Sequence, residues 1–274
     1  MFQQGILACA LAAGIVAAGA QERPQHARVE LLSRQVSMAP GPDLQLGVHF
    51  VLEPGWHIYW INPGDSGQPP VFQWRLPAGF TVGEIQWPRP ERMQPIPQLA
   101  DYGYHGEVLL PLTLHIPPAF NSRAPVEVGL DAKWLVCREV CIPEHAQLQL
   151  ALPVAPQAGT KQSSSAALFA ATEKLLPQAL PRGWKASATS AKDEFVLAIV
   201  GADKPITKAL FFPLEPGQID NPAPQRLQSS RTGARIILKK SDLLLQPIAV
   251  LRGVLVIPGR PAYRIEAPVR QPIQ

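Results

Sequence analysis

Residues 126–134 read VEVGLDAKW, and this stretch decides the fold class. Its apolar residues occupy every second position, while Glu127, Asp131 and Lys133 fall between them. A β-strand that buries one face and exposes the other needs this period of two. Strand-like runs recur on both sides of it, separated by turn-forming residues. These runs cover residues 29–36, 44–52, 56–60, 71–74, 108–116 and 147–152, and residues 126–136 extend the quoted stretch.

Many short strands of this kind, with turns between them, favour an immunoglobulin-like β-sandwich in an all-β chain. The composition agrees with that prediction. The chain has 274 residues, of which 46% are hydrophobic and 17% charged, and it contains 31 prolines. So many prolines argue against long helices, because each proline removes a backbone donor. The apolar content excludes disorder throughout, and the length suffices for one large or two medium domains.

The chain changes character after residue 152. Residues 153–165, PVAPQAGTKQSSS, concentrate turn-forming residues without periodic apolar positions and are predicted to form a linker. A helix is predicted over residues 165–176, ended by Pro177. Further strand-like runs cover residues 195–200, 206–212, 234–238, 248–257 and 262–266. We therefore expect one domain over residues 21–152 and a second, smaller β-rich domain over residues 166–274.

The first twenty residues, MFQQGILACALAAGIVAAGA, are largely apolar and end in small residues. They predict a secretory signal peptide with cleavage before Gln21, which would remove Cys9. The segment has no Lys or Arg ahead of its apolar run, and a short membrane anchor is the alternative. No later apolar stretch approaches the roughly 18–20 residues that span a bilayer. The mature chain is therefore not expected to span a membrane, and we place it in an exported, oxidising compartment.

Cleavage would leave two cysteines, Cys137 and Cys141, which are expected to pair with each other. Continuing the alternation from residue 126 places Val136 on the buried face and Cys137 on the polar face, so the pair should be accessible. Three interpretations remain open at this point. The pair performs thiol-disulfide exchange, forms a structural bridge, or binds copper or zinc together with His145.

Two further segments are unusual. Residues 55–67, GWHIYWINPGDSG, place three aromatic residues ahead of a turn-forming run, which favours core aromatics and a tight loop over a binding site. Residues 101–107, DYGYHGE, read as an aromatic loop that either turns the chain or covers a reactive group with a tyrosine ring.

The formal net charge of +4 does not indicate a nucleic-acid partner. The 25 basic and 21 acidic residues are interspersed, and Lys239–Lys240 is the longest basic run. A nucleic-acid surface usually needs clustered Lys and Arg with stacking aromatics. We therefore expect no nucleic acid among the partners.

Three motifs together carry a family resemblance. They are Trp134-x-x-Cys137-x-x-x-Cys141-x-Pro143, residues 55–67, and residues 102–107. In this order they resemble the amino-terminal periplasmic domain of DsbD-type thiol:disulfide interchange proteins, in particular the ScsB-like branch. The resemblance covers residues 28–152. The second half resembles the extra β-domain that follows in the longer members.

The resemblance implies a periplasmic domain with catalytic Cys137 and Cys141 and no cofactor. The pair would take electrons from a thioredoxin-like or membrane-embedded donor and pass them to oxidised periplasmic proteins. The family's membrane-spanning and thioredoxin-like domains have no counterpart in this sequence, so we expect a separate protein to be the donor. The family also has an aromatic cap loop over its cysteines. The corresponding residues here are Asp101, Tyr102, Tyr104 and His105.

The alternative from another class is a non-catalytic periplasmic binding or adaptor module. Its Cys137–Cys141 bridge would be structural, or the two cysteines and His145 would hold copper.

Overall fold

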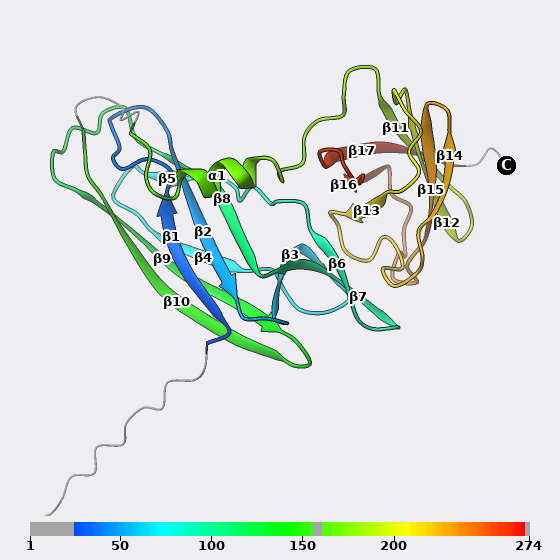
Figure 1. The fold of residues 1–274 in the computed structure, drawn as a ribbon, viewed down its shortest axis with the longest axis horizontal. Helices are drawn as coiled ribbons and strands as arrows, with labels where there is room; N and C mark the ends of the chain where they lie inside the picture. Colours follow the sequence, from blue (N-terminus) through cyan, green and yellow to red (C-terminus); the bar gives the residue numbers. More distant parts are fainter. Residues whose placement is uncertain (1–24, 156–160, 272–274) are drawn as a thin grey trace, which may run out of the picture.

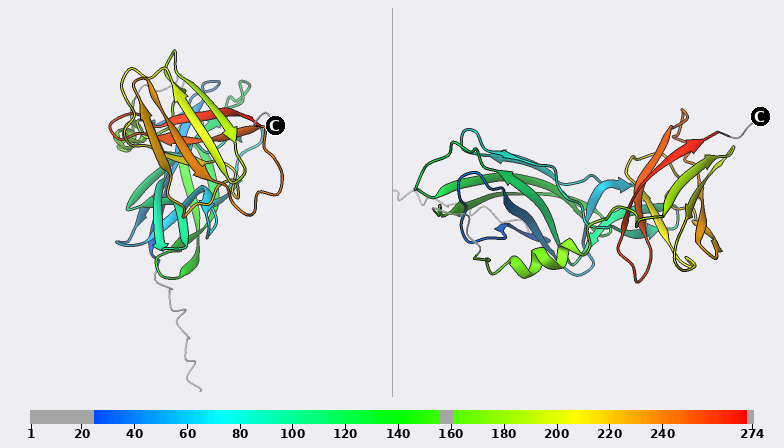
Figure 2. Two further views of the ribbon diagram at one scale, coloured as in Figure 1. Left: turned by 90° about the vertical axis from the view of Figure 1, so that its right-hand side faces the viewer. Right: turned by 90° about the horizontal axis from the view of Figure 1, so that it is seen from above.

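Strand-forming alternation in both halves of the chain produces two β-rich bodies that lie side by side (Figure 1). The computed structural model describes residues 25–155 and 161–271, so the predicted signal peptide lies outside the described residues. The two bodies follow one another along the longest axis of the molecule (Figure 2). The predicted all-β class, with a sandwich followed by a second β-rich region, is confirmed.

The first body is a sandwich of two sheets, in which every strand pair is antiparallel. One described sheet has the order β1-β2-β8-β5. The other has the order β10-β9-β3-β7-β6, with β4 also paired to β9. The strands are β1 Ala27–Ser33, β2 Leu44–Leu52, β3 His57–Gly64, β4 Val71–Arg75, β5 Thr81–Val82, β6 Glu91–Ile96, β7 Leu99–His105, β8 Glu107–His115, β9 Val126–Cys137 and β10 Cys141–Leu152.

The core of the sandwich follows the alternation read from the sequence. In β9, Val128, Leu130 and Val136 are fully buried, whereas Glu127 and Lys133 are exposed. Phe50 of the opposite sheet meets Trp134 edge to face, with ring centroids 5.4 Å apart. This contact joins the inner faces of the two sheets, as the packing of a β-sandwich requires.

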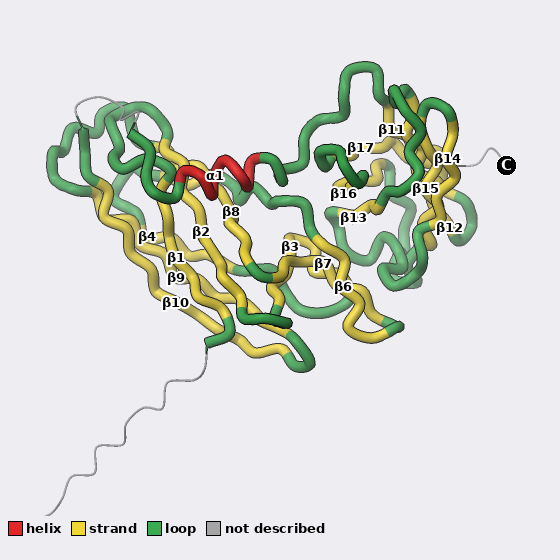
Figure 3. Tube along the Cα trace, viewed as in Figure 1, coloured by secondary structure: helices red, strands yellow, loops and turns green. Residues whose placement is uncertain are grey.

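The chain beyond β10 stays in contact with the first body. Val154 forms a β-bridge with Met38, and Gln162 forms one with Gln35. Helix α1, Ala166–Glu173, then packs against β8 and buries Phe169. We expected this helix to open the second domain; Figure 3 shows it lying along β8 of the first body.

The second body has the strand order β13-β16-β17-β11-β12-β15-β14 in the described residues. Its pairs are antiparallel except β11 with β17, which run parallel. A separate apolar cluster fills this body, including Phe195, Leu197, Phe211 and Ile265. The strands are β11 Lys185–Ser190, β12 Glu194–Val200, β13 Leu210–Pro213, β14 Arg226–Ser230, β15 Gly233–Lys239, β16 Val250–Val256 and β17 Tyr263–Arg270.

The two bodies share a packed contact. The ring of Phe212, on β13, meets Tyr102 of β7 edge to face at 5.1 Å and Trp60 of β3 at 6.4 Å. Phe212 is buried and belongs to the same apolar cluster as the core of the sandwich. Among the described residues, no helix has the length and apolar character that a membrane crossing requires.

Replacing Phe50 by alanine tests the core. The side chain is fully buried between the sheets, so its removal should lower the free energy of unfolding by about 3–5 kcal/mol. Denaturant unfolding of the oxidised protein measures this. Val71→Ala, at a position 54% exposed, is the control and should change stability by less than about 0.5 kcal/mol. Equal effects of the two changes would contradict this core.

Candidate functional site

The two cysteines lie opposite each other at the end of the β9–β10 hairpin. Cys137 ends β9, Cys141 begins β10, and the two are direct partners in the antiparallel register, with Cα atoms 4.1 Å apart. They form a disulfide across the three-residue connection 138–140. The predicted pairing is therefore present in the structure.

The two cysteine residues differ in exposure. Cys141 is an exposed residue, while Cys137 is only 2% exposed. We expected Cys137 on an exposed polar face, and that expectation is wrong. At this point β3 runs beside β9 in the same sheet and places His57 directly opposite Cys137. Only the Cys141 side of the bridge is open to an incoming group.

A buried tyrosine contacts the exposed cysteine. The Tyr59 hydroxyl lies 3.4 Å from Cys141 Sγ and 3.3 Å from Ser66 Oγ. Ser66 Oγ donates its own proton to Asp101 Oδ2 at 2.7 Å. A disulfide sulfur carries no proton and the Ser66 proton is directed at Asp101, so the single Tyr59 proton faces two acceptors, Cys141 Sγ and Ser66 Oγ. The geometry therefore places the phenolic O–H within hydrogen-bond distance of the Cys141 sulfur.

Burial keeps this donor protonated. It raises the pKa of the Tyr59 phenol above its ordinary value, and the charge of Asp101 acts in the same direction. Burial also raises the pKa of the Asp101 carboxyl, an effect opposed by hydrogen bonds from Ser66. Tyr59 thus remains a neutral hydrogen-bond donor at ordinary pH.

The turn after β3 holds the tyrosine ring in place. Gly67 has a positive φ of 71°, and a Cβ there would lie 2.0 Å from a Tyr59 ring carbon. Only glycine lets the backbone approach the ring this closely. Ser66 N also donates to Asp101 Oδ1 at 3.0 Å, which joins the turn to β7. The sequence favours core aromatics and a tight loop for residues 55–67. It does not predict the contact of Tyr59 with Cys141.

Two histidines flank the buried side of the bridge. The rings of His57 and His105 lie 5.5 Å apart, and His57 meets Tyr59 edge to face at 5.2 Å. Burial, and secondarily the nearby His105, lowers the pKa of His57 to about 4. His57 is therefore a neutral imidazole beside Cys137, and its Nε2 is buried without a hydrogen-bond partner.

The connection between the cysteines is exposed at its tip, where Val140 is 63% exposed. Arg138 could in principle stabilise a thiolate, but its guanidinium lies over the Trp56 ring at 5.1 Å. Trp56 in turn stacks on His26 with ring centroids 3.7 Å apart. The cation–π contact holds the Arg138 side chain on this ring.

The segment expected as a cap loop is strand β7. Because successive side chains of a strand point to opposite faces, the predicted cap residues fall into two groups. Asp101 bonds to Ser66 and His105 pairs with His57, so both lie at the site. Tyr102 and Tyr104 point away: their hydroxyls donate to Asn221 Oδ1 at 2.9 Å and to the Pro88 carbonyl at 2.8 Å. A lid movement of this segment stays a prediction.

His145 does not join the cysteines. It is exposed on β10 opposite Lys133, four residues beyond Cys141, which corresponds to about 13 Å of extended strand. Nowhere in the described ranges do three or more His, Cys, Asp or Glu side chains gather as a metal site would require.

The fold and the site together describe an immunoglobulin-like β-sandwich domain with a disulfide at the end of a hairpin, one cysteine exposed and the other buried. Residues 28–153 match the family described as "Thiol:disulfide interchange protein DsbD, N-terminal". The matched residues run from β1 to just beyond β10 and so span the first body.

Other comparisons bear on the fold. The crystal structure of the N-terminal periplasmic domain of ScsB from Proteus mirabilis is 17% identical, with a TM-score of 0.69 over 91% of this chain and 95% of that one. Two periplasmic chaperones, SfaE and YadV, are 10% and 9% identical, cover 88% and 87% of this chain and 100% and 99% of their own, and have TM-scores of 0.22, too low to support an argument. No curated protein matches the chain.

The pKa of His57 predicts a pH dependence of stability. Between its ordinary value of 6.5 and about 4, the unfolded chain binds a proton that folded His57 does not. The free energy of unfolding should therefore fall by about 2–3 kcal/mol as pH drops through this window. Urea unfolding of the wild type and His57→Gln at both ends of the window measures it. The variant should lack this part of the loss, and an unchanged loss would contradict a neutral His57.

Proposed function

We propose that this protein is an exported thiol-disulfide interchange protein that passes reducing equivalents through Cys137 and Cys141. The observation that carries the proposal is the asymmetric bridge, in which Cys141 is exposed beneath a phenolic donor and Cys137 is buried. Exchange requires an attacking thiolate to reach one sulfur in line while the other sulfur leaves. The family of residues 28–153 supports the same chemistry.

In the loading step a partner thiolate attacks Cys141 Sγ. A partner–Cys141 bond forms, the Cys137–Cys141 bond breaks, and Cys137 leaves as a thiolate that takes a proton. The partner's second thiolate then attacks its own sulfur in the mixed disulfide and releases Cys141. The partner loses two electrons and becomes a disulfide, and this protein gains them as a dithiol.

In the delivery step the roles are reversed. The Cys141 thiolate attacks the disulfide of an oxidised protein, and Cys137 then attacks Cys141 Sγ to release the reduced product. The Tyr59 hydroxyl favours the Cys141 thiolate because a hydrogen bond to a charged form stabilises it. Neutral His57 beside Cys137 adds no positive charge that would hold Cys137 as a thiolate.

The proposal includes a place and partners. Residues 1–20 act as a signal peptide, and the mature protein works in the periplasm. Its donor is a thioredoxin-like or membrane-embedded protein, and its acceptor is an oxidised periplasmic protein. We assign the redox chemistry to residues 21–152 and regard residues 166–274 as a second domain without its own redox group, since that segment has no cysteine.

The reduction potential of the pair is the first test. Protein beginning at Gln21 is equilibrated in graded dithiol buffers, and its free thiols are counted by mass spectrometry. We expect a value between about −150 and −270 mV, the range of exchange proteins. A value below about −300 mV would instead support the structural bridge of a binding module, because physiological dithiols would not open it.

Single serine variants test the division of roles. Cys137→Ser leaves the exposed Cys141, which should react rapidly with an aromatic disulfide reagent and keep a stable mixed disulfide. Cys141→Ser leaves Cys137, which should react about tenfold more slowly because it is 2% exposed. Both variants should stay folded and lose turnover. Catalytic reduction of a substrate by Cys141→Ser would defeat the two-cysteine mechanism.

A further inference from the structure

The turn that holds Tyr59 against Cys141 is anchored to the second body as well as to its own sandwich. This turn, residues 62–67, includes the last residues of β3 and the following Asp65 and Ser66. Asp65 Oδ1 accepts a hydrogen bond of 2.8 Å from Nδ2 of Asn221, which lies 156 residues further along the chain. The side chain of Asn62 donates to the Pro213 carbonyl at 2.8 Å, which provides a second anchor.

The orientation of the Asn221 amide is fixed from both ends. Its Oδ1 accepts from the buried Tyr102 hydroxyl at 2.9 Å, so its Nδ2 must face the Asp65 carboxylate. Asn221 is 5% exposed, and an amide buried with both ends paired has one stable rotamer. It therefore presents a fixed donor to the turn.

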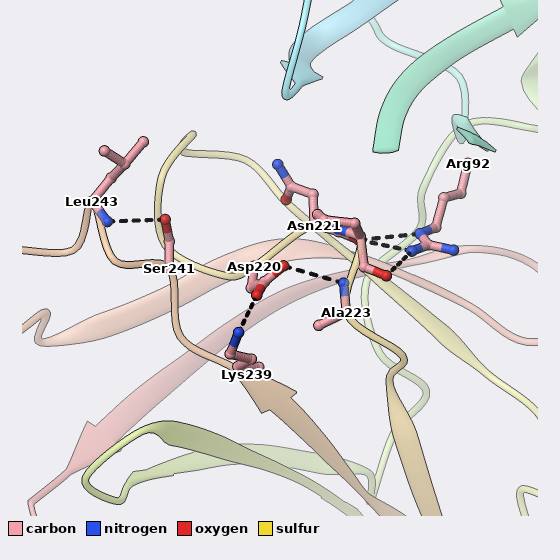
Figure 4. A network of polar contacts seen from close by, with 8 residues as sticks. Arg92, Asp220, Asn221, Ala223, Lys239, Ser241 and Leu243 are labelled. Atoms are coloured by element: carbon pink, nitrogen blue, oxygen red, sulfur yellow. Dashed lines mark hydrogen bonds and ion pairs between the residues drawn. The ribbon is translucent and has the colours of Figure 1, made fainter. Parts of the chain in front are cut away.

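The backbone around Asn221 is held as well. Arg92 Nη2 donates to the Asn221 carbonyl at 2.8 Å and to the Pro222 carbonyl at 2.9 Å. The preceding residue, Asp220, pairs with Lys239 within the second body, as Figure 4 shows. Arg92 comes from β6 of the sandwich, so this contact joins the two bodies (Figure 4).

Asp65 is linked to the sulfur through its chain neighbour Ser66. Asp65 Oδ2 accepts from the backbone N–H of Ala100 at 2.8 Å, which pins the turn to β7. The next residue, Ser66, bonds to Asp101 and to Tyr59, and the Tyr59 hydroxyl reaches Cys141 Sγ. Asp65 and Ser66 are adjacent in the chain, so a displacement of Asp65 would act on the hydrogen bonds that Ser66 makes with Asp101 and Tyr59.

We infer that the second domain is the support of the redox site and that Asn221 is the positioning residue through which it acts. By holding Asp65, Asn221 keeps Tyr59 over Cys141, which restricts access to the disulfide and maintains the donor for the thiolate. This role rests on the proposed interchange function, and it gives residues 166–274 a task in that function that requires no redox group of their own.

The test is the rate at which dithiothreitol reduces the Cys137–Cys141 disulfide in the whole chain. The reagent becomes its cyclic disulfide and the protein becomes a dithiol, so no biological partner is needed. Asn221→Ala should raise the second-order rate constant about tenfold, because the cover over Cys141 loses a hydrogen bond to a charged group. Asn221→Asp sets a second carboxylate against Asp65 and should raise it as well.

A matched control separates positioning from general loosening. Gln225 lies in the same segment of the second body, and its amide bonds to the backbone N–H and carbonyl of Phe211. Gln225→Ala removes two hydrogen bonds but touches none of the groups that lead to Cys141. Its rate should stay within about twofold of the wild type. An increase equal to that of Asn221→Ala would overturn the inference.

Two further readouts are specific to positioning. In a Cys137→Ser background, Asn221→Ala should raise the pH midpoint of Cys141 alkylation by iodoacetamide, because the thiolate loses its Tyr59 donor. In the double variant Asp65→Ala with Asn221→Ala, the disulfide should be reduced no faster than in the faster of the two single variants. A rate increase equal to the product of the two single increases would contradict coupling through Asp65. If no protein partner ever exchanges with the pair, the proposed function fails, but these measurements still decide the role of Asn221.

Discussion

The antiparallel register of β9 and β10 is the constraint on which both the core and the site depend. The same ladder that puts Trp134 and Val136 into the sandwich sets Cys137 directly opposite Cys141. A slip of one residue would turn the apolar set toward solvent and separate the two cysteines. The burial of the core therefore pins the geometry of the disulfide, and the bridge does not have to stabilise the fold by itself.

Beside this hairpin, the site contains a group of hydrogen-bonded polar side chains, Tyr59, Ser66 and Asp101. Asp101 is 1% exposed, and its two carboxylate oxygens accept hydrogen bonds from the backbone N–H and the hydroxyl of Ser66. A low-dielectric environment makes an unpaired group costly, and it strengthens each hydrogen bond that is made. The hydrogen bonds among Tyr59, Ser66 and Asp101 thus hold the Tyr59 hydroxyl beside Cys141 Sγ. Asn221 Nδ2 makes a further hydrogen bond of this kind, to Asp65, across the contact between the two bodies.

Much of the sandwich was predictable because period two is a local signal. The predicted strand 44–52 coincides with β2, and the predicted strand 126–136 differs from β9 by one residue. Strand β7 was missed because its glycine and aspartate resemble a loop, although Ala100, Tyr102 and Tyr104 alternate as a strand requires. Helix α1 was predicted from the sequence, but a local pattern does not determine which body its apolar side packs against.

The all-β class, the family resemblance of the first domain and the cysteine pair could be predicted from the sequence alone, because alternation and motif spacing are written along the chain. The tertiary structure was needed to show which cysteine is exposed, that Tyr59 rather than Tyr102 or Tyr104 contacts it, and that Asn221 bonds to the neighbouring turn. Those properties depend on β3 and β7 lying beside the end of β9, and on a second domain packed against them. Contacts between residues more than eighty positions apart leave no periodic trace in a single sequence.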